Sequence, residues 1–192
     1  MRFVSLFDEL TMIRQLTFKD GTIKLLEQRI VISPSIVFSD YSMAINDSPD
    51  KVAEFYKSIK SSSKANFAES VGKSYGFNFQ NYFDWMTKIV VLSGWGRWKW
   101  DLLDEEKKMG KISVSESPVA ENLKGKVKCP VDHVIRGFMA GGASASLKID
   151  IDVVEEECVA LGAPQCKFVF KPHDQFEPTP EVIRQIGQIN RR

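Results

Sequence analysis

The sequence has few of the side chains that perform general acid–base or nucleophilic chemistry. Only 2 histidines and 3 cysteines occur among its 192 residues. It contains no glycine- and lysine-rich loop that would hold a nucleotide phosphate, no flavin-binding motif, and no serine, histidine and aspartate arrangement typical of hydrolases. We therefore expect a protein that is not an enzyme.

The chain also lacks an excess of charge of either sign and lacks a long apolar run. Its 26 Lys+Arg against 25 Asp+Glu give a formal net charge of +1, so no long-range field favours nucleic acid or an acidic membrane surface. No apolar stretch approaches the length of a membrane span, and acids interrupt the apolar residues near the N-terminus, unlike in a signal peptide. These absences predict a cytoplasmic protein with no membrane span and no direct nucleic-acid binding.

The first half of the sequence carries one hairpin signal and several helical patterns. Asp20-Gly21 separates two short strand-like runs and predicts a tight turn. The run from Gln28 to Phe38 fits a strand or the start of a buried helix equally well. Helices are expected in three places, namely after the Ser48-Pro49 start signal, from Phe67 to Tyr75, and over residues 82–92.

The middle of the chain contains a tryptophan-rich run and the start signals of two helices. The tryptophan-rich run 94–100 fits a surface for a ligand or partner, but an aromatic strand or turn that covers the core is the favoured interpretation. Ser117-Pro118 predicts the start of a short helix. A longer helix is expected to begin at Pro130, with Gly137 and Gly141 among the small residues that allow a neighbouring backbone to approach closely.

All three cysteines lie between residues 129 and 166, among several acidic residues. Alternating patterns before the three glutamates of residues 155–157 and from Cys166 to Phe170 predict two strands joined through a turn at 162–164. Such a hairpin would bring Cys158 close to Cys166. Converging thiol and carboxylate groups are typical ligands of zinc, which makes a metal centre the first candidate site.

Three separated blocks of this region, residues 115–121, 130–141 and 154–168, resemble the 4-vinyl reductase domain family. More weakly, residues 16–36 resemble the segment that precedes this domain in bacterial activators that sense phenols and related aromatics. The resemblance implies an α+β fold, in which a helical layer packs on a small antiparallel sheet. This fold is shared with vesicle-tethering TRAPP subunits and haem nitric-oxide sensor domains, which are commonly dimeric.

The resemblance also implies a division of the chain and a metal-ligand set. Residues 1–45 would form an N-terminal hairpin and dimerisation segment, residues 46–172 the ligand-binding domain, and residues 173–192 a proline-rich tail or short helix. A structural zinc would be held by a set of positions that corresponds here to Asp132, Glu155, Cys158 and Cys166. The aromatic sensors have a cysteine where this chain has Asp132. Asp132 therefore ligates the metal, Cys129 replaces it, or the site has lost its metal.

A small-molecule pocket is implied between the middle helices and the sheet. The residues expected to line it are all apolar, and no polar anchor for a phenol hydroxyl stands out among them: Phe79, Phe83, Trp85, Met86, Ile89, Val114 and Val153. The leading hypothesis is a homodimeric sensor of a hydrophobic or aromatic molecule that signals to an unidentified protein partner, in a role such as transcription regulation. The alternatives are a scaffold or lipid/acyl carrier subunit resembling the tethering proteins and an accessory protein related to tetrapyrrole vinyl reductases.

Overall fold

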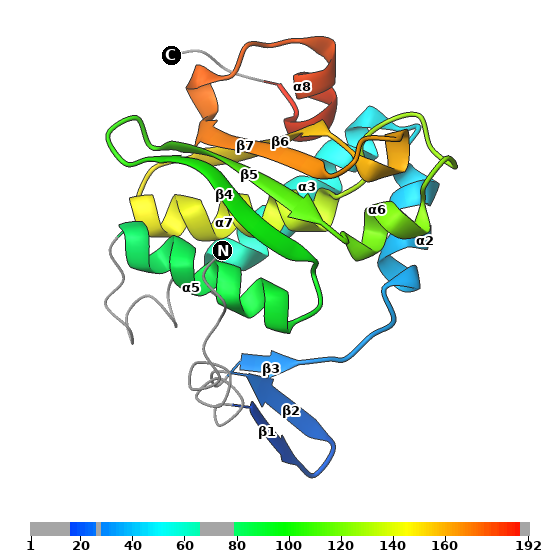
Figure 1. Cartoon of the computed structure of the whole chain (residues 1–192), viewed down its shortest axis with the longest axis vertical. Helices are drawn as coiled ribbons and strands as arrows, with labels where there is room; N and C mark the ends of the chain where they lie inside the picture. Colours follow the sequence, from blue (N-terminus) through cyan, green and yellow to red (C-terminus); the bar gives the residue numbers. More distant parts are fainter. Residues whose placement is uncertain (1–15, 26–27, 66–78, 189–192) are drawn as a thin grey trace. The chain divides into compact units, whose positions relative to one another are not determined.

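The computed structural model describes residues 16–25, 28–65 and 79–188 (Figure 1). The chain divides into two compact units, residues 1–34 and residues 35–192. The helix expected from Phe67 to Tyr75 lies outside the described residues. No helix in the described ranges is both long enough and apolar enough to cross a membrane.

The N-terminal unit contains a small antiparallel sheet. Its strands are β1 (Leu16–Lys19), β2 (Thr22–Leu25) and β3 (Gln28–Ile30), in the order β1-β2-β3. Asp20 and Gly21, between β1 and β2, have φ angles of 49° and 75°. Positive φ at both central residues is the requirement of the tight turn that joins hairpin strands. The predicted hairpin is therefore confirmed, and the ambiguous run after Gln28 becomes a strand followed by a helix that begins at Ile36.

The second unit is built on a four-stranded antiparallel sheet with the order β4-β5-β7-β6. The strands are β4 (Arg97–Asp104), β5 (Met109–Ser115), β6 (Ile151–Glu157) and β7 (Cys166–Pro172). Alternate residues of β7, namely Cys166, Phe168 and Phe170, are all fully buried, as the alternating pattern predicts. The tryptophan-rich run becomes the start of β4, with Trp98 buried in the core. This arrangement matches the favoured interpretation of that run.

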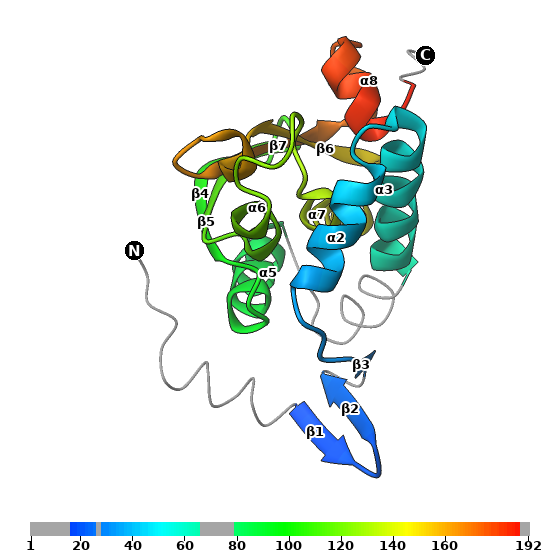
Figure 2. The same ribbon diagram turned by 90° about the vertical axis from the view of Figure 1, so that its right-hand side faces the viewer.

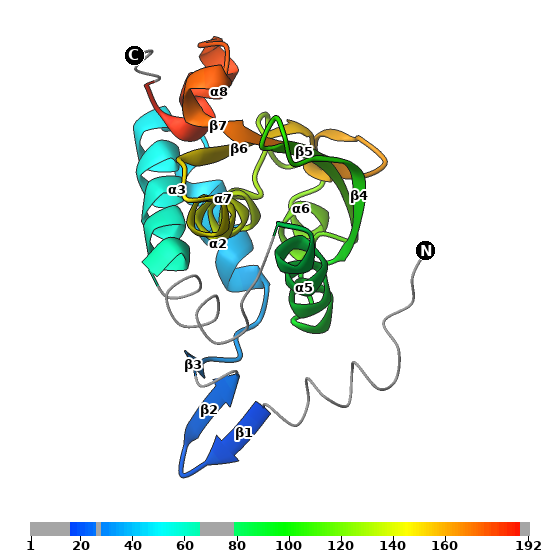
Figure 3. The same cartoon turned by 90° about the vertical axis from the view of Figure 1, so that its left-hand side faces the viewer.

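The described residues of the second unit also form six α-helices. They are α2 (Ile36–Ile45), α3 (Pro49–Ser63), α5 (Phe79–Leu92), α6 (Pro118–Asn122), α7 (His133–Leu147) and α8 (Pro180–Ile186). In Figures 2 and 3, α5 and α7 lie beneath the sheet and cover one of its faces, α3 lies alongside α7, and α8 lies next to the β6 end of the sheet. Ser117 caps α6, because its side chain accepts a hydrogen bond from the N–H of Ala120. The predicted start of α6 is thus confirmed.

The start of α7 differs from the prediction. The helix begins at His133 and not at Pro130, with Asp132 as its cap at φ −79° and ψ 50°. The N–H of Asp132 donates to a carboxylate oxygen of Glu155 at 3.1 Å, which is a contact with another strand. A long-range hydrogen bond therefore fixes the first residue of the helix, and the local proline signal does not.

Small residues let α7 and α3 pack closely together. A Cβ atom placed on Gly137 would lie 2.7 Å from the Cβ of Ile59, and one on Gly141 would lie 2.6 Å from the Cβ of Ser63. The Ser63 hydroxyl donates to the backbone carbonyl of Phe138 at 2.8 Å across the same interface. The close backbone approach predicted from the glycines is therefore confirmed.

Side chains from these helices satisfy the outer edge of β6, the last strand of the sheet. Ser144 on α7 accepts from the N–H of Ile151 at 2.9 Å and donates to its carbonyl at 3.1 Å. At Val153, the N–H donates to the Tyr56 hydroxyl at 3.1 Å, and the carbonyl accepts from Arg136 at 3.4 Å. Buried backbone groups require partners of this kind, so the helical layer replaces a missing fifth strand.

Candidate functional site

The β6–β7 hairpin brings two thiols and a carboxylate together. Glu155 lies near the end of β6, Cys158 follows that strand, and Cys166 begins β7. One potential ligand atom from each of the three lies within 4.8 Å of the others, and all three residues are buried. A register irregularity between Glu155 and Glu157 accompanies this cluster at the end of β6. The predicted approach of Cys158 to Cys166 is confirmed.

Asp132 adjoins this cluster from the start of α7. Its carboxylate accepts a hydrogen bond from the Ser117 hydroxyl at 2.7 Å, and its backbone N–H binds the carboxylate of Glu155. One oxygen of each carboxylate, Oδ2 of Asp132 and Oε1 of Glu155, is buried without a hydrogen-bond partner among the described residues. A buried carboxylate without a partner is costly unless a proton or a cation neutralises it. Each of the two oxygens therefore requires a proton or a cation.

The ionisation of the four groups indicates the same need. Burial, and next the charge of Asp132, raise the pKa of Glu155 well above its usual value. Burial also raises the pKa of Asp132. A hydrogen bond with Cys166 lowers the pKa of the Cys158 thiol to about 7, whereas the same contact, together with burial, raises that of Cys166. Four such groups repel one another when all are charged, and a divalent cation removes that repulsion.

Cys129 is the other residue that the sequence offered to complete the metal site. It is half-buried, and its backbone carbonyl accepts a hydrogen bond from the Asn46 side chain at 3.4 Å. Among the described residues, neither Cys129 nor Asp132 is one of the three whose ligand atoms lie within 4.8 Å of one another, but the N–H of Asp132 binds the Glu155 carboxylate. Of the two residues expected to complete the metal site, the structure places Asp132 next to the cluster.

A second acidic group contains Asp150, Asp152 and His173. Here a protein cation is already present, because the Lys60 ammonium lies 2.7 Å from a carboxylate oxygen of each aspartate. The Tyr56 hydroxyl donates to Asp152 at 2.6 Å, and His173 also pairs with Asp152. This group is a salt-bridge network that fastens α3 to β6.

Most residues predicted to line a ligand pocket lie in the core between α5 and the sheet. Phe83, Met86, Val114 and Val153 are fully buried, Ile89 is nearly so, and Trp85 is partly buried against the core. Phe79 begins α5, but its side chain lies outside the described residues. The structure thus places the described members of the set in or against one apolar interior.

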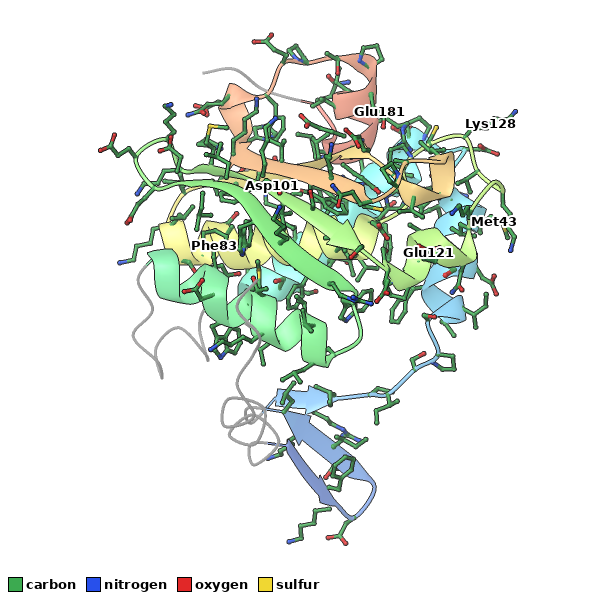
Figure 4. The ribbon with its side chains drawn as sticks, viewed as in Figure 1. Met43, Phe83, Asp101, Glu121, Lys128 and Glu181 are labelled. Atoms are coloured by element: carbon green, nitrogen blue, oxygen red, sulfur yellow. The ribbon has the colours of Figure 1, made fainter. Side chains whose placement is uncertain are left out.

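Aromatic rings that were not among the predicted pocket residues surround Phe83. Figure 4 labels Phe83 between α5 and the sheet. Its ring stacks on Phe170 of β7, with centroids 5.0 Å apart and planes at 18°, and meets the edge of Trp100 at 5.0 Å. Because the alternation in β7 already placed Phe170 on the buried face, that partner was available from the sequence, whereas Trp100 depends on how β4 pairs with β5.

The same interior holds polar atoms that the sequence did not reveal. The Tyr82 hydroxyl lies 3.5 Å from the Met86 sulfur and is packed against Gly142, where a Cβ would collide with it. Burial raises the pKa of Tyr82, so the hydroxyl stays neutral. The indole N–H of Trp100 donates to the Thr87 hydroxyl at 2.8 Å. The Thr87 hydroxyl in turn donates to the backbone carbonyl of Phe83 at 2.8 Å, so these polar groups are paired within the protein.

These features accompany a family similarity. Residues 111–172 match the V4R domain family. The resemblance that the three sequence blocks indicated is confirmed, and the V4R segment runs from β5 through the metal-ligand candidates to the end of β7. No curated protein matches the chain.

Solved structures share the fold. The phenol-responsive sensory domain of the transcription activator PoxR, solved with phenol, has a TM-score of 0.76 and 21% identity, covering 98% of this chain and 100% of that domain. Weaker matches are a vinyl-4-reductase family protein from Methanocaldococcus jannaschii and a trafficking protein particle complex subunit 3 from Naegleria fowleri covalently bound to palmitic acid. The vinyl-4-reductase family protein has a TM-score of 0.46 and 21% identity, and the match covers 90% of this chain and 96% of that one. The trafficking subunit has a TM-score of 0.48 and 10% identity, and the match covers 72% of this chain and 94% of that one. The match to the PoxR domain confirms the predicted α+β fold.

Proposed function

We propose that this chain is a non-enzymatic sensor module for a hydrophobic or aromatic small molecule. The observation that carries the proposal is its similarity to the phenol-responsive sensory domain, which extends over 98% of the chain at a TM-score of 0.76. The ligand is proposed to lie between α5 and the sheet, where Phe83, Trp100 and Phe170 offer ring surfaces for stacking. Tyr82 is proposed to provide a neutral hydroxyl for a polar group of the ligand.

Entry of a ligand into this interior requires a movement, because Phe83 stacks directly on Phe170. Because Phe83 belongs to α5, we propose that this helix shifts when a ligand enters, while α3 and α7 stay packed on each other at Gly137 and Gly141. A ligand that separates Phe83 from Phe170 would favour the arrangement in which α5 has shifted. Such a difference in ligand affinity between two arrangements is what drives a conformational response.

The metal centre is proposed to hold a structural zinc ion through Asp132, Glu155, Cys158 and Cys166. Two thiolates and two carboxylates form a closed tetrahedral set, which leaves no coordination position for a substrate. When bound, zinc supplies the positive charge that allows these groups to be ionised side by side. The protein residues then join the β6–β7 hairpin to the start of α7.

The remaining parts of the proposal concern assembly and output. Residues 1–45 are proposed to mediate homodimerisation, residues 46–172 to bind the ligand, and residues 173–192 to form a C-terminal tail. The signal would pass to an unidentified protein partner, in a role such as transcription regulation in the cytoplasm. The PoxR domain, which is a sensory domain of a transcription activator, supports this assignment.

The test is native mass spectrometry of the full chain before and after mild denaturation, combined with thermal melting in the presence of phenol. We expect one zinc per chain and a dimer mass. Phenol at about 100 times its dissociation constant should stabilise the protein by about 2.7 kcal/mol, which raises the melting temperature by roughly 5–10 °C.

Two outcomes would contradict the ligand assignment. Melting temperatures that stay constant with phenol and with other simple aromatics would exclude the aromatic class. Release of a retained fatty acid on denaturation would favour the lipid-carrier alternative. Phe83→Leu is the matching variant, because it keeps the core apolar but removes the stacked ring, and it should weaken phenol binding about fivefold, as expected from the loss of about 1 kcal/mol of ring contact.

A further inference from the structure

The side chain of Gln185, on α8, binds the backbone of one residue of β6. Its amide oxygen accepts from the N–H of Glu155 at 2.8 Å, and its amide nitrogen donates to the carbonyl of the same residue at 3.0 Å. This is the pair of hydrogen bonds that a neighbouring strand would supply. Because β6 is the edge strand, Gln185 occupies the place of that strand opposite Glu155.

The orientation of the Gln185 amide is fixed by its surroundings. Its nitrogen also donates to the carboxylate of Glu181 at 2.7 Å, one turn earlier on α8, where Figure 4 labels that residue. Only one orientation of the amide places the nitrogen next to two acceptors and the oxygen next to a donor. In addition, Arg136 of α7 donates to the backbone carbonyl of Gln185 at 2.9 Å, and the Gln185 side chain is fully buried. The contact is therefore rigid.

Glu155 connects this contact to the metal centre. Its backbone binds α8, whereas its carboxylate binds the N–H of Asp132 and lies in the cluster with Cys158 and Cys166. The register irregularity between Glu155 and Glu157 interrupts the regular ladder with β7 just beyond this residue. Gln185 therefore binds β6 at Glu155, next to the position where the regular pairing of β6 with β7 is interrupted.

We propose that Gln185 is a positioning residue of the metal centre and that docking of α8 and binding of zinc stabilise each other. The proposal rests on the zinc site put forward under the proposed function. Partners that orient a ligand typically contribute ten- to hundredfold to metal affinity. Because coupling between two binding events is reciprocal, removal of zinc must loosen α8 by the same factor by which loss of the clamp weakens zinc. The helix thereby responds to the state of the metal centre.

The first measurement is zinc affinity of the full chain by competition with a chromogenic chelator. Gln185→Leu keeps the size of the side chain but removes both hydrogen bonds to Glu155, and it should bind zinc ten- to hundredfold more weakly. The matched control is Ser144→Ala, which removes the equivalent pair of hydrogen bonds from Ile151, on the same strand edge. The control should bind zinc within about threefold of the wild type, well below the ten- to hundredfold loss expected for Gln185→Leu.

The second measurement is hydrogen exchange of residues 180–186 with and without zinc. We expect faster exchange when zinc is removed from the wild type and no zinc dependence in Gln185→Leu. Wild-type zinc affinity in Gln185→Leu, or exchange of α8 that ignores zinc in the wild type, would overturn the coupling. Should Gln185→Leu fail to fold, Gln185→Asn replaces it, because its amide is one methylene shorter and cannot keep both hydrogen bonds to Glu155, yet it stays neutral beside Glu181.

Failure of the coupling and failure of the zinc site give different results. If Cys158→Ser loses zinc while Gln185→Leu binds it as tightly as the wild type, the metal centre stands and the coupling is wrong. If Cys158→Ser and Cys166→Ser both retain the zinc content of the wild type, the proposed ligands are wrong and the coupling falls with them. A selective loss in Cys158→Ser and Gln185→Leu, with Ser144→Ala unaffected, supports both.

Discussion

Gly141→Ala is expected to destabilise the protein, although alanine is the better residue for a helix. Gly141 lies on α7 where that helix meets α3. An added Cβ would lie 2.6 Å from the Cβ of Ser63, 2.8 Å from the backbone nitrogen of Lys64, and closer still to the carbonyl oxygen of Lys60. Two of these three atoms belong to the backbone, so rotation of a side chain cannot relieve the collision. The two helices must separate instead.

The magnitude follows from two opposing effects. Alanine in place of glycine in a helix interior favours folding by about 1 kcal/mol. Forcing a methyl group into a packed interior costs about 1–3 kcal/mol, and contact with backbone atoms places Gly141 at the upper end of that range. The net loss is about 1–2 kcal/mol. For a chain of this size each kcal/mol corresponds to about 2–4 °C, so the melting temperature should fall by about 2–8 °C.

The assay is thermal unfolding followed by circular dichroism, with urea unfolding as a second measure of stability. Ser146→Ala is the control, because it raises the helix propensity of α7 without adding volume, and it should leave the melting temperature unchanged or slightly higher. A Gly141→Ala protein as stable as the wild type would refute the close packing of α3 and α7. A parallel loss in Ser146→Ala would show that α7 itself, and not its contact with α3, is sensitive.

Two further perturbations test the polar networks. Lys60→Met should lower the free energy of unfolding by about 2–3 kcal/mol, measured by urea titration, because it leaves the buried Asp152 carboxylate with weaker compensation; an unchanged midpoint would contradict this. Burial alone would raise the pKa of Asp152, but attraction to Lys60 and hydrogen bonds from Lys60, Tyr56 and His173 hold it below its usual value. The carboxylate therefore contributes stability above its ordinary pKa of about 3.9, and this is lost as the pH falls through the lowered value. The wild type and Lys60→Met should accordingly converge in stability between about pH 4 and pH 2, and a constant difference would refute the assignment.

Local signals were sufficient to predict much of the fold. Asp20-Gly21 predicted a hairpin because positive φ is easily adopted there, and Ser117-Pro118 predicted the start of α6 because a capping oxygen precedes a residue without an N–H. The alternation from Cys166 to Phe170 predicted which face of β7 is buried. Each of these features depends on residues that are close in the sequence.

Features that depend on distant partners could not be predicted in the same way. Helix α7 starts directly after Asp132, whose N–H binds the carboxylate of Glu155, 23 residues further along the chain. The Trp100 ring reaches Phe83 only because β4 pairs with β5 in one register. Gln185 lies in a short C-terminal helix with no sequence motif, and nothing in its neighbourhood indicates that its amide replaces a strand. Pairing across the chain decides these contacts.

The contacts within the second unit are of two kinds. On one side, α3, α7 and β6 are joined by glycine contacts, the Lys60–Asp152 network and side chains that satisfy the strand edge. On the other side, α5 packs on the core through buried aromatic and aliphatic side chains, whose contacts are less directional than buried ion pairs. A ligand between α5 and the sheet would therefore displace α5 and leave the frame of α3, α7 and β6 in place. The proposed zinc ligands lie on the β6–β7 hairpin and at the start of α7, away from α5, so we expect ligand binding and zinc binding to act on different elements of the second unit.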